Sequence, residues 1–222
     1  MAKRTVNSPS LKAKNGKPIW LLVSTDIVAI VLVLTGFTFT QASLSELAQS
    51  EFVRDLLFAA IGPLIATFLN DILPSNAKAI IVFWRIKDAL PGHRAFSEHA
   101  DADPRVNLAA LEIIIGEFPQ SPRDQNSCWY KLFQKHQSNI IVSDSHERFL
   151  LFRDLSSLTL LILVVAWITS ALFGATAALQ AMIVAALLAQ FLWLAISAQN
   201  TGIRLVQNVL ALESSYDGGT KK

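Results

Sequence analysis

Few residues of this chain could do chemistry, and the first is a carboxylate within an apolar stretch. Asp26 is the only charged residue of 19–40. A charged group in a bilayer is costly, so Asp26 is a functional candidate. The alternative is that it lies about two helical turns from the cytoplasmic end, where Ser24, Thr25 or a neighbouring helix holds it. Gln190, near the middle of a later apolar stretch, should hydrogen-bond across a helix interface.

The densest group of polar residues follows Pro91-Gly92. Histidines and carboxylates together can bind a divalent metal. The spacings here match no metal site, so we expect a solvated loop, no metal and no cofactor. Arginines beside turn residues could instead receive a phosphate or a partner's carboxylate. The candidates for binding a partner or ligand are His93, Arg94, Arg123, Trp129 and His146.

Motifs of known enzymes are absent from the sequence. It has no nucleotide-binding glycine loop, no His-Glu-x-x-His, no paired-cysteine zinc pattern and no nucleophile elbow. The single cysteine, Cys128, cannot form an intramolecular disulfide, and we interpret it as a small apolar residue beside Trp129. We therefore predict no catalytic residue and a protein that is not an enzyme.

The composition indicates a membrane protein. Of 222 residues, 52% are hydrophobic and only 16% charged, against about 25% in soluble domains. The stretch Leu155 to Ile203 has no Asp, Glu, Lys or Arg. At about 1.5 Å per residue, a helix of this length crosses a hydrocarbon layer of about 30 Å twice. We expect the reversal at 173–176, where Gly174 relaxes the backbone.

The apolar stretches predict an all-α membrane protein with four spans in two hairpins. The first hairpin, 19–73, comprises spans at about 19–40 and 52–73, and the second, 155–200, comprises spans at about 155–173 and 177–198. Pro63 would kink the second span. The alternative for that segment is a re-entrant or interfacial helix. A full crossing is favoured because it keeps the central basic residues on the side of the basic N-terminal tail.

Residues 74–154 are soluble in composition and predict a small helical cytoplasmic domain between spans 2 and 3. We expect its first helix to run from a cap at Ser75 or Asn76 to Ala89, although the run Ile80–Trp84 also suits a strand. A second helix should begin at the cap Asp103, before Pro104. Its apolar face should contain Val106, Ala110, Ile113 and Ile114.

Two further helices complete the predicted domain. One should begin at the cap Ser121, with an apolar stripe of Trp129, Leu132 and Phe133. The other should begin with a capping box of Asp144 and Glu147. No Gly or Pro follows before Gly174, so this last helix should continue through the third span. It would give a mechanical route from the domain to the membrane, or it is merely the simplest connection.

The remaining segments indicate topology and assembly. Residues 1–18 predict a disordered, basic cytoplasmic tail; we interpret its charge as setting orientation rather than binding lipid or nucleic acid. Residues 201–222 should form a cytoplasmic helix and tail. Small residues at four-residue spacing allow close helix packing, within one subunit or in a homo-oligomer. They are Ala181, Ala185 and Ala189.

We expect a multi-pass subunit of the bacterial inner membrane with both termini in the cytoplasm. Its central domain would bind a cytosolic protein partner or ligand and pass the event to the spans, as a sensor or effector. Stress or phage-defence (antiviral) systems use small membrane subunits of this layout. The alternative is an oligomeric ion channel or small transporter with Asp26 lining the path. A membrane enzyme acting at the loop from His93 to Asp103 is a third hypothesis.

Overall fold

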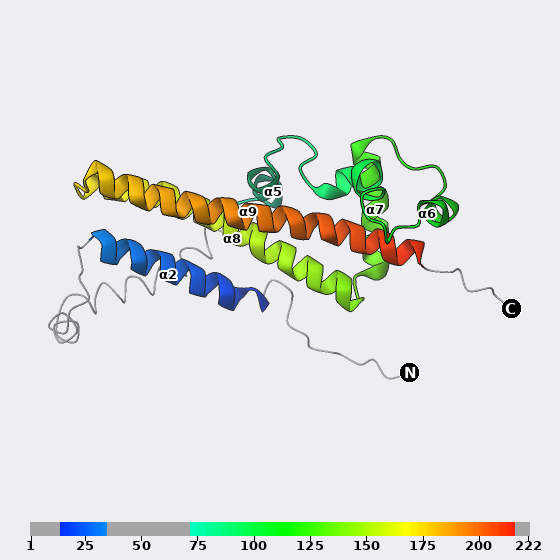
Figure 1. Ribbon diagram of the computed structural model, residues 1–222, viewed down its shortest axis with the longest axis horizontal. Coiled ribbons are helices and arrows are strands. Elements are labelled where there is room, and N and C mark those ends of the chain that lie inside the picture. Colours follow the sequence, from blue (N-terminus) through cyan, green and yellow to red (C-terminus); the bar gives the residue numbers. More distant parts are fainter. Residues whose placement is uncertain (1–13, 35–71, 216–222) are drawn as a thin grey trace. The chain divides into compact units, whose positions relative to one another are not determined.

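The computed structural model describes residues 14–34 and 72–215, and these residues form helices and loops without a strand. The helices follow in the order α2 (Gly16–Leu34), α5 (Ser75–Phe83), α6 (Leu108–Ile115), α7 (Pro122–His136), α8 (Ile140–Leu172) and α9 (Ala177–Ser214). A 3-10 turn, η1 (Pro91–Arg94), and a π-turn, η2 (Ala95–His99), lie between α5 and α6. The prediction of an all-α protein is confirmed at this level (Figure 1).

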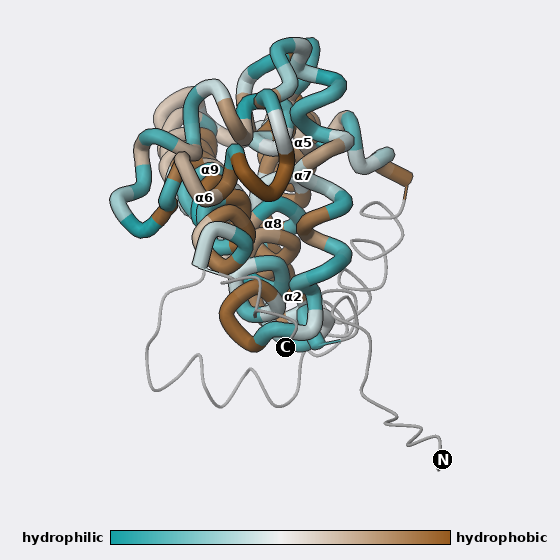
Figure 2. The backbone as a smooth tube through the Cα atoms, turned by 90° about the vertical axis from the view of Figure 1, so that its right-hand side faces the viewer, coloured by the Kyte–Doolittle hydropathy of each residue, from teal (hydrophilic) through white to brown (hydrophobic). Residues whose placement is uncertain are grey.

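Three helices of the described chain, α2, α8 and α9, are long and apolar enough to cross a membrane. Their hydrophobic residues are coloured brown in Figure 2. The predicted span 52–73, apart from its last two residues, and the end of the first span, 35–40, lie outside the described residues. Of the four predicted spans, the described part of the chain therefore supports three.

The chain divides into two compact units. Within the described residues, the first comprises 14–34, 72–74 and 154–194. Here Val23 of α2 packs against Leu158 of α8, and Ala166 of α8 packs with Ile183 and Leu187 of α9. The α8–α9 connection turns where predicted, with Gly174 at φ +71°, which glycine adopts at little cost.

The second unit comprises residues 75–153 together with the C-terminal part of α9, from 195. Its hydrophobic core has two clusters, and α9 contributes to both. Leu205 and Val209 pack with residues of α5, α7 and α8. Val206 and Leu210 pack with the π-turn and with Leu111 of α6. The C-terminal part of α9 is thus the centre of this unit, as its place in Figure 1 shows.

The first two predicted helices of this unit need correction. Helix α5 ends at Phe83, not at Ala89, because Trp84 adopts a left-handed conformation at φ +54°. Helix α6 begins at Leu108, and its cap is Asn107 rather than Asp103. The carboxylate of Asp103 instead accepts hydrogen bonds from Arg105, which competes with capping.

The predicted apolar face of α6 is confirmed only in part. Val106 is buried and Ala110 is half-buried, as predicted, but the two isoleucines are not. Leu111 is fully buried, whereas Ile113 is 86% exposed and Ile114 is 44% exposed. Glu112 separates Leu111 from the run Ile113–Ile115, and three consecutive isoleucines give no periodicity from which the sequence could select the buried face.

The prediction for α7 is confirmed, and that for α8 is confirmed except for its start. Helix α7 begins at the cap Ser121, whose hydroxyl accepts from the Asp124 amide, and Phe133 is buried with Trp129 and Leu132 packed around the core. Helix α8 is continuous, as predicted, but begins at Ile140. The capping box at Asp144 is wrong, because that residue lies inside the helix and pairs with Arg148.

The C-terminal end of α9 is held by a buried carboxylate. Glu213 is 1% exposed, and its two oxygens accept from Lys135 Nζ at 2.7 Å and His136 Nε2 at 2.5 Å, both at the end of α7. Burial alone would raise the pKa of Glu213, but the hydrogen bonds and the positive charge of Lys135 outweigh it and leave the pKa below its ordinary value.

We expect Glu213→Gln to lower the free energy of unfolding by about 3 kcal/mol, because it breaks a buried charge pair. Because the folded pKa is depressed, the carboxylate's contribution is present above about pH 4.5 and is lost as pH falls below it. Thermal unfolding of the detergent-solubilised protein between pH 3 and pH 7 measures both effects. The exposed residue Glu112 provides the control, Glu112→Gln; equal losses in the two variants would contradict the assignment.

Candidate functional site

The second unit contains a half-open cavity of about 440 Å³, within the size range of small-molecule sites. Its walls come from the turn Leu90–Gly92 and from helices α7, α8 and α9. Helix α7 contributes four residues, α8 contributes four and α9 contributes two. They are Asn126, Trp129, Tyr130, Phe133, His146, Phe149, Leu150, Arg153, Gly202 and Leu205.

Aromatic rings form the apolar part of the cavity wall. Trp129 stacks on Phe133 with ring centroids 5.6 Å apart, and Tyr130 lies 5.9 Å from the same ring. His146 meets Phe133 edge-on at 5.0 Å. Rings in these geometries present rigid, flat surfaces of the kind that bind planar or aliphatic ligands.

Two glycines let the walls approach closely. A Cβ at Gly92 would lie 2.8 Å from Trp129 Cε3 and would also collide with Asn126. A Cβ at Gly202 would lie 3.0 Å from Phe83 Cζ and 3.1 Å from Phe149 Cδ2. The turn η1 can therefore pack closely against α7, and α9 against α5 and α8, because these positions lack side chains.

The cavity also has one cation and one titratable ring. The Arg153 guanidinium lies 5.8 Å from the centre of the Phe149 ring, in cation–π geometry. Burial, and then the charge of Arg153, lowers the pKa of His146, which favours its neutral imidazole. A neutral imidazole offers one donor and one acceptor, and Arg153 supplies a positive charge. The polar groups therefore favour a ligand with an anionic or acceptor group.

Of the five predicted binding residues, the structure brings Trp129 and His146 together in this cavity. The other three lie elsewhere. His93 Nδ1 is 3.0 Å from the Pro122 carbonyl oxygen, and Arg94 pairs with Glu98 at 2.9 Å. Arg123 is exposed at the start of α7.

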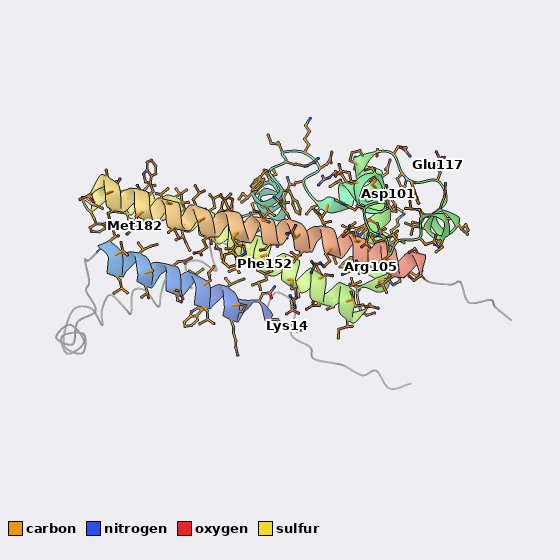
Figure 3. The ribbon with its side chains drawn as sticks, in the orientation of Figure 1. Lys14, Asp101, Arg105, Glu117, Phe152 and Met182 are labelled. Atoms are coloured by element: carbon orange, nitrogen blue, oxygen red, sulfur yellow. The ribbon has the colours of Figure 1, made fainter. Side chains whose placement is uncertain are left out.

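The histidine-rich loop also resolves into separate contacts. The pKa of Asp103 lies below its ordinary value, chiefly because of hydrogen bonds from Arg105, a residue labelled in Figure 3. His99 is buried, and burial lowers its pKa. Among the residues that the structure describes, no three His, Cys, Asp or Glu side chains group closely enough to hold a metal ion. Burial raises the pKa of Cys128, which disfavours its thiolate.

In the first unit, the two polar residues predicted within apolar stretches meet. Gln190 Nε2 of α9 donates to Asp26 Oδ2 of α2 at 2.9 Å and lies 3.5 Å from Thr159 Oγ1 of α8. The sequence left Ser24, Thr25 or a neighbouring helix as possible partners of Asp26, and the observed partner comes from a neighbouring helix. Thr25 instead donates to the Leu21 carbonyl within its own helix. This polar contact therefore joins three helices of the unit.

A second cavity, of about 300 Å³, lies beside this contact and is lined by Asp26, Gln190 and apolar residues of α2 and α9, including Met182, labelled in Figure 3. The alanines predicted for helix packing, Ala181, Ala185 and Ala189, are exposed in the described structure. Ile183 and Leu187 make the α8–α9 contact instead. A role for the alanines in packing against another subunit stays a prediction.

The sequence analysis missed Phe149, Arg153 and Gly202 as cavity residues. Phe149 and Arg153 follow His146 at three and seven positions, which places all three on one face of a helix. Gly202 is an isolated glycine within a helical pattern, a signal of close packing. The sequence contains these signals, but it does not show which helices these residues contact.

We expect Asp26 and Gln190 to stabilise the first unit jointly. Gln190→Leu and Asp26→Asn should each destabilise it, with a coupling energy of about 1 kcal/mol in a double-mutant cycle. Unfolding of the detergent-solubilised protein in increasing SDS gives the four free energies. Gln180→Leu is the matched control, because the side chain of Gln180 donates to the nearby Ala175 carbonyl at the start of the same helix. Additive effects of the two substitutions would refute the coupling.

Comparisons of the chain with protein families, with curated proteins and with solved structures find no match. The chemistry of the two cavities and of the Asp26–Gln190 contact therefore carries the functional proposal.

Proposed function

We propose that the protein is a membrane-embedded sensor or effector subunit whose ligand cavity lies in the unit formed by 75–153 and the end of α9. The observation that supports this proposal most is the position of the cavity on α8. His146, Phe149 and Arg153 line it, and the same helix continues without Gly or Pro into the charge-free segment from Leu155.

A continuous helix can transmit a change of position or rotation, because its backbone hydrogen bonds make it stiff over many turns. A ligand in the cavity would touch α8 and α9 together. If it binds one arrangement of these helices better than another, it shifts their equilibrium by its differential affinity. By analogy of layout, we assign the subunit to a bacterial stress or phage-defence system, with the cavity on the cytoplasmic side.

The ligand proposal is tested with the full-length protein in lipid nanodiscs and the low-molecular-mass fraction of a host-cell extract. Saturating ligand should raise the Tm by about 5 °C, since only the folded state binds it. Tyr130→Ala removes a half-exposed wall of the cavity and should abolish the rise. Ile113→Ala, an exposed position outside the cavity, should retain it. The absence of a rise in any extract fraction, or an equal rise in the Tyr130 variant, would contradict the proposal.

The coupling is tested separately at Val164, which is exposed in the apolar part of α8. A Val164→Cys protein on a Cys128→Ser background is treated with a maleimide. We expect the extract fraction that raises the Tm to change the labelling rate, and Tyr130→Ala to remove that change. A raised Tm with an unchanged labelling rate would show that the protein binds a ligand but does not transmit the binding through α8.

A second candidate function is an ion channel, which the cavity beside Asp26 and Gln190 favours. A carboxylate between helices can attract a cation. Asp26→Asn preserves the side chain's shape and should lower cation flux several-fold in reconstituted vesicles. Gln180→Leu is the control and should conduct like the unmodified protein. No flux with or without extract, or equal flux in Asp26→Asn, would remove this candidate.

A further inference from the structure

The loop between α5 and η1 exposes apolar and basic side chains in alternation. Trp84 is 56% exposed and Ile86 is 83% exposed, and Arg85 and Lys87 are exposed beside them. Within this loop, residues 84–88 begin and end in a left-handed backbone conformation, at Trp84 with φ +54° and at Asp88 with φ +49°. Such a conformation is unfavourable for a bulky residue, and it holds the tryptophan out of the core.

Contacts with α9 fix the level of this loop along that helix. Gln199 Nε2 donates to the Val82 carbonyl oxygen at 2.6 Å, and Phe83 packs against Gly202. The charge-free stretch of α9 ends immediately after this point, at Ile203, and the exposed Arg204 follows. The loop therefore leaves α5 at the boundary between the apolar and the polar part of α9.

We propose that this loop, residues 84–88, docks on the anionic headgroups of the bilayer that α8 and α9 enter. Tryptophan favours the interface between hydrocarbon and water, because its ring is apolar and its N–H is polar. Arg85 and Lys87 supply the charge that complements anionic lipid. The acid of the loop, Asp88, lies 3.5 Å from His93 Nδ1, so its carboxylate is directed to a side chain of η1.

Another exposed isoleucine provides the contrast. Ile113 on α6 is 86% exposed, as much as Ile86. The α6 cap is tied to the end of α9, since the Asn107 amide donates to Ser214 Oγ at 3.1 Å. Ser214 is twelve residues after Gly202, or about 18 Å along the helix. Ile113 therefore belongs to the polar end of α9, and we expect no lipid contact there.

The experiment uses the full-length Cys128→Ser protein in vesicles containing phosphatidylglycerol. A fluorescent NBD probe is attached to Ile86→Cys or, as the matched control, to Ile113→Cys. Nitroxide-labelled lipid should quench the probe at position 86 strongly and leave position 113 accessible to aqueous iodide. Equal quenching at the two positions, or protection of position 86 from both quenchers, would overturn the proposal; the latter would indicate a protein partner.

The charge requirement is tested on the same labelled protein. Arg85→Gln and Lys87→Gln should each lower the ratio of docked to undocked loop about fivefold, and neutral phosphatidylcholine vesicles should have a similar effect. The exposed Lys131 on α7 provides the control substitution, Lys131→Gln, which should leave the quenching unchanged. Quenching that is insensitive to both charge removal and lipid charge would refute docking on anionic headgroups.

Discussion

The second unit depends on the burial of one stripe of α9. Val206, Val209 and Leu210 are fully buried, each contributing about 1.5–3 kcal/mol by removal from water. This stripe faces two hydrophobic clusters at once, so α5, α6, α7 and α8 are all positioned with respect to the same helix. The buried Glu213, held by Lys135 and His136, fixes the end of that helix to the end of α7.

The cavity of about 440 Å³ lies among the helices that pack on α9. The large rings of Trp129, Phe133 and Phe149 line its walls. Gly92 and Gly202 bring the turn and α9 close enough to complete the wall. Since α8 lines the cavity and also continues as an apolar helix, a ligand there would act on an element that the membrane also constrains.

The first unit shows a different balance of forces. Its helices present apolar side chains to one another, and apolar contact alone specifies little in a lipid environment, where lipid tails offer the same contact. The hydrogen bond from Gln190 to Asp26, with Thr159 close by, is directional and therefore selects one register among α2, α8 and α9. A polar group of this kind can stabilise an assembly and still serve an ion path, because both roles need a partner inside the apolar layer.

Sequence alone determined the features that depend on local chemistry. These are the helical class, the uninterrupted α8, the turn at Gly174 and the cap at Ser121, each set by residues close in the chain. It also identified Asp26 and Gln190 as polar residues that need partners, but not that they partner each other across 164 positions. Tertiary structure decided the end of α5 at Phe83, the start of α6 at Leu108 and the meeting of Trp129 with His146. The contacts that accompany these features join residues far apart in the chain, such as Asn107 with Ser214 and Phe83 with Gly202, and local preferences carry no information about such contacts.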